Sequence, residues 1–339
     1  MVNDKDLKNI LNAYGIHLKE ILQKENGTFF IREESESFVL HKSTIDQEQI
    51  DMWETVFHHA NEHKIASILP IYPTAKGDLY VMRKDDMFYL TPYIETAETR
   101  NITDLFKTVA TIHKKTKRTF IIPKQDLMAS FKLYEDEMKT NRMYVQQTID
   151  LFEQQQYMSP LELQVCSHFH VIDDAFEKSL DHVVSILEMC DEDENDHMEW
   201  SSSLCHNRLS TEYVLENQAQ YIGNWEAASL TNATQDIAVL CRNEFLRNEY
   251  SLEPFIEGLI EYEELYGLSD LEEHILAIHL LHPLPYIRSL RTYISQRDEK
   301  PVISQVVELE RLFRVVANSF NLLYEFEQQK PNMFNEASD

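Results

Sequence analysis

A change in hydrophobic pattern near residue 100 limits the folds open to this chain. Before it, short runs rich in β-branched and aromatic residues alternate with charged turns, which is typical of antiparallel strands. After it, apolar residues recur every three or four positions over long stretches, which indicates amphipathic helices. One short β interruption, at 213–223, lies inside the helical region. This order predicts an α+β protein with a small strand-rich lobe followed by a mainly helical lobe.

The first third of the chain is predicted to hold five strands and one helix. GTFFIR and SFVLHK, separated by the charged turn EESE, indicate a hairpin. ASILPIY, GDLYVMRK and DMFYLTPYI are predicted as three further strands. The segment 46–64 places Ile50, Trp53, Val56 and Phe57 at helical spacing, so we expect one helix there.

The remainder is predicted to be helical apart from the hairpin EYVLENQAQYIG. We place the boundary of the lobes between residues 95 and 96, so the β-rich lobe is 1–95. The helical lobe, 96–339, would carry the segment 203–229 with its lone hairpin. Helices are expected at 101–117, 123–157, 160–190, 252–266, 269–296 and 302–328.

Charge excludes several classes of partner. The chain has 31 Lys and Arg against 58 Asp and Glu, a formal net charge of −27. Such a surface repels nucleic acid and anionic lipid, so we expect neither as a partner. No run reaches about 18 consecutive apolar residues, and the N-terminus lacks the apolar core of a secretion signal. The four cysteines show no zinc-like spacing, which suits a reducing compartment.

The segment LCHNRLSTEYVL, residues 204–215, has the rhythm of a phosphotransferase catalytic loop. It resembles the pattern HGDLHxxN followed by two apolar residues, found in aminoglycoside phosphotransferases and choline kinases. His206 matches the opening histidine, Arg208 falls at the catalytic aspartate, and Tyr213 falls at the metal-binding asparagine. A guanidinium can neither accept a proton nor bind a cation, and a phenol is a poor neutral ligand for Mg²⁺.

The segment YIGNWEAAS resembles the family's second metal-binding segment, I-D-W-E/D. Asn224 stands where the family has its second magnesium-binding aspartate, while Trp225 and Glu226 keep the pattern. The resemblance therefore implies a protein-kinase-like fold in which the base and both metal ligands are replaced. Since removing one preorganised electrostatic group commonly costs about 100- to 1,000-fold in rate, little catalysis is expected.

The strand SFVLHK resembles the strand that carries the family's phosphate-binding lysine. Alternation puts Val39 and His41 on one face and Lys42 on the other, so His41 takes the inward position. A bulge could bring Lys42 inward instead. The following helix offers Glu48 or Glu54 as the customary ion-pair partner of that lysine.

Two further resemblances complete the predicted site. FYLTPYIE resembles the hinge between the lobes, and TQDIAVL the downstream segment whose aspartate, here Asp236, is expected to brace the catalytic loop. The structural motif residues are His206, Trp225 and Asp236. The predicted vestigial nucleotide cleft consists of His41, Lys42, Glu54, Tyr93, Glu95 and Glu226.

Smaller features leave alternatives open. Arg208 could pair with Glu212 or Glu226 in place of the lost metal, or it could simply face water. His59 and His63, spaced by four residues with Glu62 beside them, could bind a transition metal or line a polar helix surface. The tract DEDEND, 191–196, lacks the glycine and the final glutamate of a calcium loop and is predicted to be solvated.

Within the superfamily, the chain looks most like the kinase-related spore coat proteins of the CotS/YutH type. The resemblance implies a catalytically inactive structural or scaffold component, located in the spore coat or the mother-cell cytoplasm of a spore-forming bacterium. Other spore coat proteins would be its partners, and we expect no cofactor and no metal. The alternative is a divergent small-molecule phosphotransferase acting on a hydroxyl group, which would require ATP and magnesium.

Overall fold

The structure is a computed structural model that describes residues 4–17, 20–25, 27–33, 36–95, 101–217, 219–247, 251–295 and 301–336. The chain forms two compact units. The N-terminal unit comprises residues 1–101 and 211–229, and the C-terminal unit comprises 102–210 and 230–339. This grouping differs from the predicted lobes, because the segment 211–229 belongs to the N-terminal unit.

Backbone pairing explains why the hairpin groups with the N-terminal strands. Its strands are β8 (Val214–Glu216) and β9 (Gln220–Ile222), as predicted from the sequence. The Ile222 amide donates to the Ser67 carbonyl at 2.7 Å, and the Leu69 amide donates to the Ile222 carbonyl at 3.0 Å. Because these hydrogen bonds join backbone groups only, the pattern of side chains in the sequence does not predict them.

The N-terminal unit is built on a five-stranded antiparallel sheet in the order β1-β2-β3-β5-β4. The predicted hairpin is confirmed as β2 and β3, which pair from Thr28 opposite His41 to Glu33 opposite Glu36. The strands are β1 (Glu20–Glu25), β2 (Thr28–Glu33), β3 (Glu36–Ser43), β4 (Val81–Arg83) and β5 (Asp86–Pro92).

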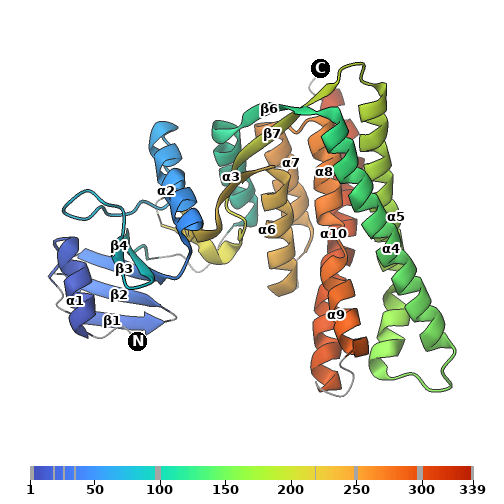
Figure 1. Ribbon diagram of the computed structural model, residues 1–339, viewed down its shortest axis with the longest axis horizontal. Helices are drawn as coiled ribbons and strands as arrows, with labels where there is room; N and C mark the ends of the chain where they lie inside the picture. The colour runs from blue at the N-terminus through green and yellow to red at the C-terminus, as the bar shows by residue number, and fades with distance from the viewer. Residues whose placement is uncertain are drawn as a thin grey trace. The chain divides into compact units, whose positions relative to one another are not determined.

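Two helices accompany this sheet (Figure 1). The first, α1 (Asp4–Ala13), buries Leu7, Ile10 and Leu11 in one core with sheet residues such as Leu40. The second, α2 (Gln47–Glu62), begins at a capping box in which the Asp46 carboxylate accepts from the Gln49 amide. Its predicted apolar positions are buried: Ile50, Trp53, Val56 and Phe57.

The predicted strand at ASILPIY is wrong. This segment contributes only isolated bridges, Ile68 with Ile222 and Tyr72 with Leu90. Pro70 and Pro73 lack the N–H groups that a continuous ladder needs, so the run cannot pair along its length. The fifth strand is instead β1, which pairs only with β2 at the edge of the sheet.

The C-terminal unit contains a second sheet, which contradicts the prediction of a lone hairpin among helices. It has the order β10-β7-β6. The strands are β6 (Arg118–Pro123), β7 (His197–Cys205) and β10 (Ser229–Thr231). Pairing of β6 with β7 joins segments about eighty residues apart, from Arg118 opposite Ser202 to Pro123 opposite His197.

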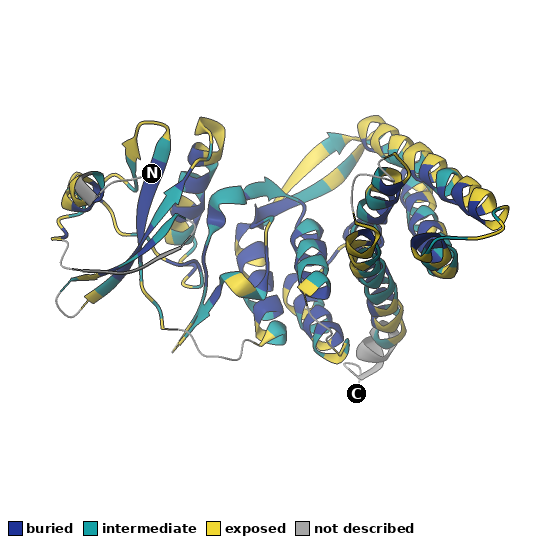
Figure 2. Cartoon of the chain, turned by 90° about the horizontal axis from the view of Figure 1, so that it is seen from below, coloured by how far each residue is buried: buried dark blue, intermediate teal, exposed yellow. Residues whose placement is uncertain are grey.

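Eight described helices make up the rest of the C-terminal unit (Figure 1). The single helix predicted at 269–296 is wrong, since a break around Pro283 divides it in two. Figure 2 shows buried faces alternating with exposed faces along these helices, as their hydrophobic periodicity requires. The helices are α3 (Ile102–Thr116), α4 (Lys124–Glu153), α5 (Pro160–Glu192), α6 (Thr234–Arg247), α7 (Glu253–Tyr266), α8 (Asp270–Leu280), α9 (Leu284–Ser295) and α10 (Val302–Glu336).

A continuous apolar core joins α4, α5, α9 and α10, and α8 contributes Ala277 to it. Its fully buried members include Met138, Phe176, Tyr286 and Leu290. Among the described residues, no helix has the length and apolar character needed to cross a membrane.

Candidate functional site

The N-terminal unit contains a cavity of about 200 Å³ between its sheet and the hairpin β8–β9. Val39 and His41 of β3 line it, as the predicted strand alternation requires, and Lys42 does not. The lining residues are Thr28, Phe30, Val39, His41, Leu69, Tyr89, Thr91, Pro92, Tyr93, Ile94, Glu212, Tyr213, Leu215, Gly223 and Asn224. We call this cavity the sheet pocket.

His41 occupies the inward position of β3, where the resemblance implies a lysine. Its ring stacks on Tyr89 with centroids 4.7 Å apart and planes 13° apart. Its Nε2 lies 3.0 Å from the Thr91 hydroxyl. Burial lowers the pKa of His41 to about 4, so the side chain is neutral near neutral pH.

Lys42 points away from the sheet pocket. Its Nζ lies 2.9 Å from Oδ2 of Asp86, on the neighbouring strand β5. The predicted pairing with Glu48 or Glu54 is therefore wrong, because the lysine lies on the face opposite to His41. Glu54 is half-buried on α2 and lies outside the pocket lining.

Glu226 is bound by two hydroxyl groups. Its Oε2 accepts from Ser43 Oγ at 2.9 Å, and its Oε1 accepts from the Tyr89 hydroxyl at 2.9 Å. Burial, together with the negative charge of Glu226, raises the pKa of Tyr89 well above its ordinary value, so that hydroxyl keeps its proton. Both carboxylate oxygens therefore have a donor within the N-terminal unit.

Asn224 and Tyr213 both line the sheet pocket. Asn224 has left-handed backbone angles, φ 58° and ψ 56°, directly before the short helix η2 (Trp225–Ala227). Trp225 is buried and its Nε1 donates to the Ile222 carbonyl at 2.8 Å, which anchors this turn. Tyr93 also lines the pocket, whereas Glu95 is exposed and does not.

The loop 206–210 lies in the C-terminal unit, where Asp236 of α6 holds it. The Asp236 carboxylate accepts from the amides of His206 and Asn207, both at 2.6 Å. It also lies 3.3 Å from His113 Nε2. Burial alone would raise the pKa of Asp236, but its bond to His113 and nearby positive charge hold the pKa below its ordinary value.

His113, Cys205 and Asp236 bring three potential metal-ligand atoms within 4.8 Å of one another, all buried. Each atom already has a hydrogen-bond partner in the protein. His113 Nδ1 lies 2.9 Å from the Tyr262 hydroxyl, and Cys205 Sγ lies 3.6 Å from the Thr231 carbonyl. Burial raises the pKa of the Cys205 thiol well above its ordinary value. This arrangement is suited to bracing the loop rather than to binding an ion.

Arg208 is exposed, and its backbone amide donates to His206 Nδ1 at 3.3 Å. Within the described part of its own unit, its guanidinium makes no ion pair. The proposed pairing with Glu212 or Glu226 stays a prediction, since both glutamates belong to the N-terminal unit.

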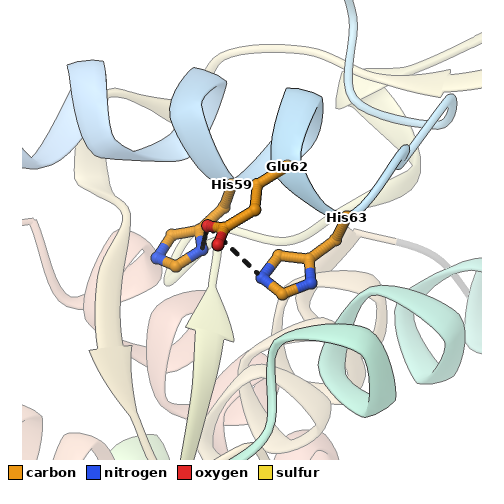
Figure 3. A group of neighbouring side chains, drawn as sticks. All are labelled: His59, Glu62 and His63. Carbon is orange, nitrogen blue, oxygen red and sulfur yellow. Dashed lines mark ion pairs between the residues drawn. The ribbon is translucent and has the colours of Figure 1, made fainter.

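His59, Glu62 and His63 lie together at the end of α2, as their spacing predicts (Figure 3). Glu62 Oε2 lies 3.9 Å from His59 Nδ1 and 3.7 Å from His63 Nε2. His59 is buried while Glu62 is exposed. Two imidazoles and a carboxylate are suitable ligands for a transition metal. Ion pairing between them accounts for the same geometry, so the metal site stays a prediction.

The acidic tract 191–196 has a local hydrogen-bonding role. The Asp193 carboxylate accepts from the backbone and side-chain nitrogens of Asn195, both at 2.8 Å. Most of the tract is exposed, as expected for a solvated loop.

The comparisons with known proteins identify the family. The model of one family, described as "Spore coat putative kinase YutH", matches residues 7–326. The chain belongs to this family. No curated protein matches the sequence.

Solved structures show the fold. An aminoglycoside phosphotransferase from Alicyclobacillus acidocaldarius subsp. acidocaldarius is similar with a TM-score of 0.71 and 13% identity, covering 95% of each chain. The AMP-bound complex of the spectinomycin phosphotransferase APH(9)-Ia is similar with a TM-score of 0.59 and 15% identity, covering 93% of this chain and 98% of that one. The predicted protein-kinase-like α+β fold is confirmed.

The sequence did not predict which side chains bind Glu226 and Asp236. Ser43 and Tyr89 hold Glu226, and His113 with Tyr262 supports Asp236. A serine, a tyrosine and a histidine within a strand or helix carry no motif of their own. Only the position of Ser43 two residues beyond His41, on the same face of β3, offered a signal.

Proposed function

We propose that this family member is a catalytically inactive kinase-like protein that serves as a structural or scaffold component of the spore coat. The observation that carries the proposal is the charge of the sheet pocket. Among the described residues that line it, none is lysine or arginine, and Glu212 adds a negative charge.

A nucleoside triphosphate needs positive charge to offset its phosphates. In the sheet pocket the inward position of β3 holds His41, whose pKa of about 4 leaves it neutral. The adjacent lysine, Lys42, forms an ion pair with Asp86 at 2.9 Å instead. The sheet pocket is therefore a mostly apolar cavity whose described lining residues include no phosphate clamp.

The divergent-phosphotransferase alternative relies on replacement ligands, namely Glu226 with Glu212, and on Lys42 as the phosphate clamp. Both oxygens of Glu226 accept hydrogen bonds from Ser43 and Tyr89, so binding Mg²⁺ would require breaking them. Asn224 offers a neutral amide where the resemblance implies a carboxylate. These features favour the inactive assignment.

The structural role follows from the family and from charge. Members of a spore coat family are expected to associate with other coat proteins, either in the coat or in the mother-cell cytoplasm where coats assemble. A net charge of −27 favours a basic protein as the direct partner.

Nucleotide binding separates the two candidate functions. Thermal unfolding of the full chain would be followed with ATP, with Mg²⁺, and with both, using an active phosphotransferase of the same fold as a positive control. We expect no increase in melting temperature that requires both ATP and Mg²⁺. An increase that needs both, and that Glu226→Gln abolishes, would support the enzyme and overturn the proposal.

Localisation tests the structural role separately. A fluorescent fusion would be expressed in the mother cell of a sporulating bacterium, alongside fusions carrying Arg208→Ala or Asn224→Ala. All three should collect around the developing spore, because neither residue is assigned a catalytic role. Diffuse fluorescence from the unaltered fusion, or loss of localisation in Asn224→Ala alone, would contradict this assignment.

A further inference from the structure

The C-terminal unit contains a pocket of about 530 Å³, a size typical of small-molecule sites. Its lining residues come mainly from α4, α6 and α8 and from β7 and β10. Its walls include Phe131 of α4, Trp200 of β7, and Ile275 and Ile278 of α8. We call this the Arg242 pocket, after the arginine that α6 contributes to it.

The charge of this pocket is opposite to that of the chain. The protein has 58 acidic residues among 339, yet none of the described residues lining the Arg242 pocket is aspartate or glutamate. The lining instead contains one arginine, Arg242, and two histidines, His279 and His282. A local region of positive potential inside a strongly acidic protein is a selective site for an anion.

Arg242 makes no ion pair with any carboxylate in the described part of the chain. Arg142, by contrast, binds both oxygens of Asp173 at 2.6 and 2.7 Å. Arg242 is half-buried, and burial lowers the pKa of its guanidinium. Burying a cation without a counter-charge costs free energy. A negative group bound in the pocket would offset that cost.

The two histidines leave Arg242 as the single full charge of the pocket. His279 Nδ1 lies 3.1 Å from the Thr234 hydroxyl, and His282 Nδ1 lies 3.5 Å from the Tyr134 hydroxyl. Burial, and then the charge of Arg242, lowers the pKa of each histidine to about 4. Near neutral pH the histidines are therefore neutral polar groups beside one cation.

We propose that the Arg242 pocket binds a small organic monocarboxylate with a flat, apolar body. A planar guanidinium pairs with a carboxylate through two parallel hydrogen bonds. One cation balances one negative charge, whereas a phosphate dianion would call for a second. Trp200 and Phe131 provide aromatic walls for the apolar body. This inference concerns the C-terminal unit alone and is independent of the proposed coat function.

Binding to the full chain would be measured by isothermal titration calorimetry with three related probes: naphthoate, the neutral naphthamide, and naphthyl phosphate. We expect naphthoate to bind with a dissociation constant of the order of 100 µM. The amide should bind at least about tenfold more weakly, because it forfeits the charge-assisted pair. Equal binding of acid and amide would overturn the proposal, and so would a preference for the phosphate.

Variants locate the site. Arg242→Met keeps an unbranched side chain without the charge, and it should weaken naphthoate binding at least about tenfold. Arg311→Met removes an exposed arginine from α10 and should leave the affinity within about twofold of the unaltered chain. Naphthoate affinity that survives Arg242→Met would place the binding elsewhere and refute the assignment.

Stability supplies a second readout that does not depend on finding the right ligand. Since Arg242 has no described counter-charge, Arg242→Met should unfold at the same temperature as the unaltered chain or higher. A clear fall in the melting temperature of Arg242→Met would show that the arginine has a structural partner. That result would contradict the proposal whatever the probes show.

Discussion

At the scale of single residues, Asp236 shows how one buried carboxylate holds the loop 206–210 in shape. Its carboxylate is buried and accepts from two loop amides at 2.6 Å while facing His113. The catalytic position two residues beyond His206 is Arg208, yet the brace below the loop is intact. The brace is therefore present in a chain that has an arginine at position 208, where the resemblance implies an aspartate.

We predict that Asp236→Asn destabilises the protein by about 2–4 kcal/mol. The amide would place two donors where the backbone already presents donors, and it would remove a buried charge-assisted network. Urea unfolding measures the change. Asp181→Asn, on the exposed face of α5, is the matched control and should stay within about 0.5 kcal/mol. An equal, small effect for both would show that the brace contributes nothing to stability.

The lowered pKa values of three histidines allow us to predict how the free energy of unfolding depends on pH. Burial lowers the pKa of His41, His279 and His282 from 6.5 to about 4. As pH falls from 6.5 towards 4, the unfolded chain takes up these protons and the folded chain does not. Stability is therefore fully present above pH 6.5 and decreases below it, by at most about 1.4 kcal/mol per pH unit for each histidine.

The contribution of one histidine can be isolated by difference. His41→Gln should flatten the fall in unfolding free energy below pH 6.5, measured by urea unfolding at several pH values. His58→Gln, on the exposed face of α2, should leave the slope as it is. If both variants follow the unaltered chain, His41 titrates alike in the folded and unfolded states.

Some features of the site follow from neighbouring residues in the sequence, and others depend on which strands lie side by side in the fold. The inward position of His41 and the outward one of Lys42 follow from strand alternation, which depends on two neighbouring residues only. Pairing of Lys42 with Asp86 depends on which strand lies beside β3, and the sequence does not state that. The same is true of Ser43 and Tyr89, which hold Glu226 from two different strands.

At the scale of elements, the packing of α7 against α3 depends on one glycine. In the C-terminal unit α7 packs against α3, and a Cβ atom placed on Gly258 would overlap the ring of Phe106. The absent side chain therefore sets the distance between the two helices. Phe106 is fully buried, so its ring has little space to move aside.

We predict that Gly258→Ala destabilises the protein by about 1–2 kcal/mol, although alanine is the better helix former by about 1 kcal/mol. Overpacking against Phe106 outweighs the gain in propensity. Thermal and urea unfolding measure the change. In the double variant with Phe106→Leu the two costs should be less than additive, because the smaller side chain leaves room for the new methyl group. Strict additivity would mean that the two sites do not interact.

Long amphipathic helices were predictable from periodicity, and short strands were less so. The apolar stripe of α2 is a local signal, and it is confirmed in the structure. Edge strands such as β1 and β6 pair on one side only, so their sequences carry no clear alternation. Pro283 could have predicted the break between α8 and α9. The apolar periodicity on both sides of it led instead to the prediction of one helix.

At the scale of the whole molecule, the net charge of −27 opposes folding. Compacting a chain brings like charges closer, so self-repulsion lowers the stability of the folded state. Salt screens this repulsion, since the Debye length falls from about 10 Å at 0.1 M to about 3 Å at 1 M. The family resemblance gives no account of this charge, which is a property of the composition alone.

We predict that adding sodium chloride raises the melting temperature by a few degrees, the reverse of what loss of stabilising surface ion pairs would cause. The matched variant neutralises four exposed carboxylates of the acidic tract, through Asp191→Asn, Glu192→Gln, Glu194→Gln and Asp196→Asn. It should be more stable at low salt and respond less to salt, because it carries less repulsion to screen. A melting temperature that falls with salt in both proteins would mean that attractive pairs, such as Arg142 with Asp173, outweigh the net charge.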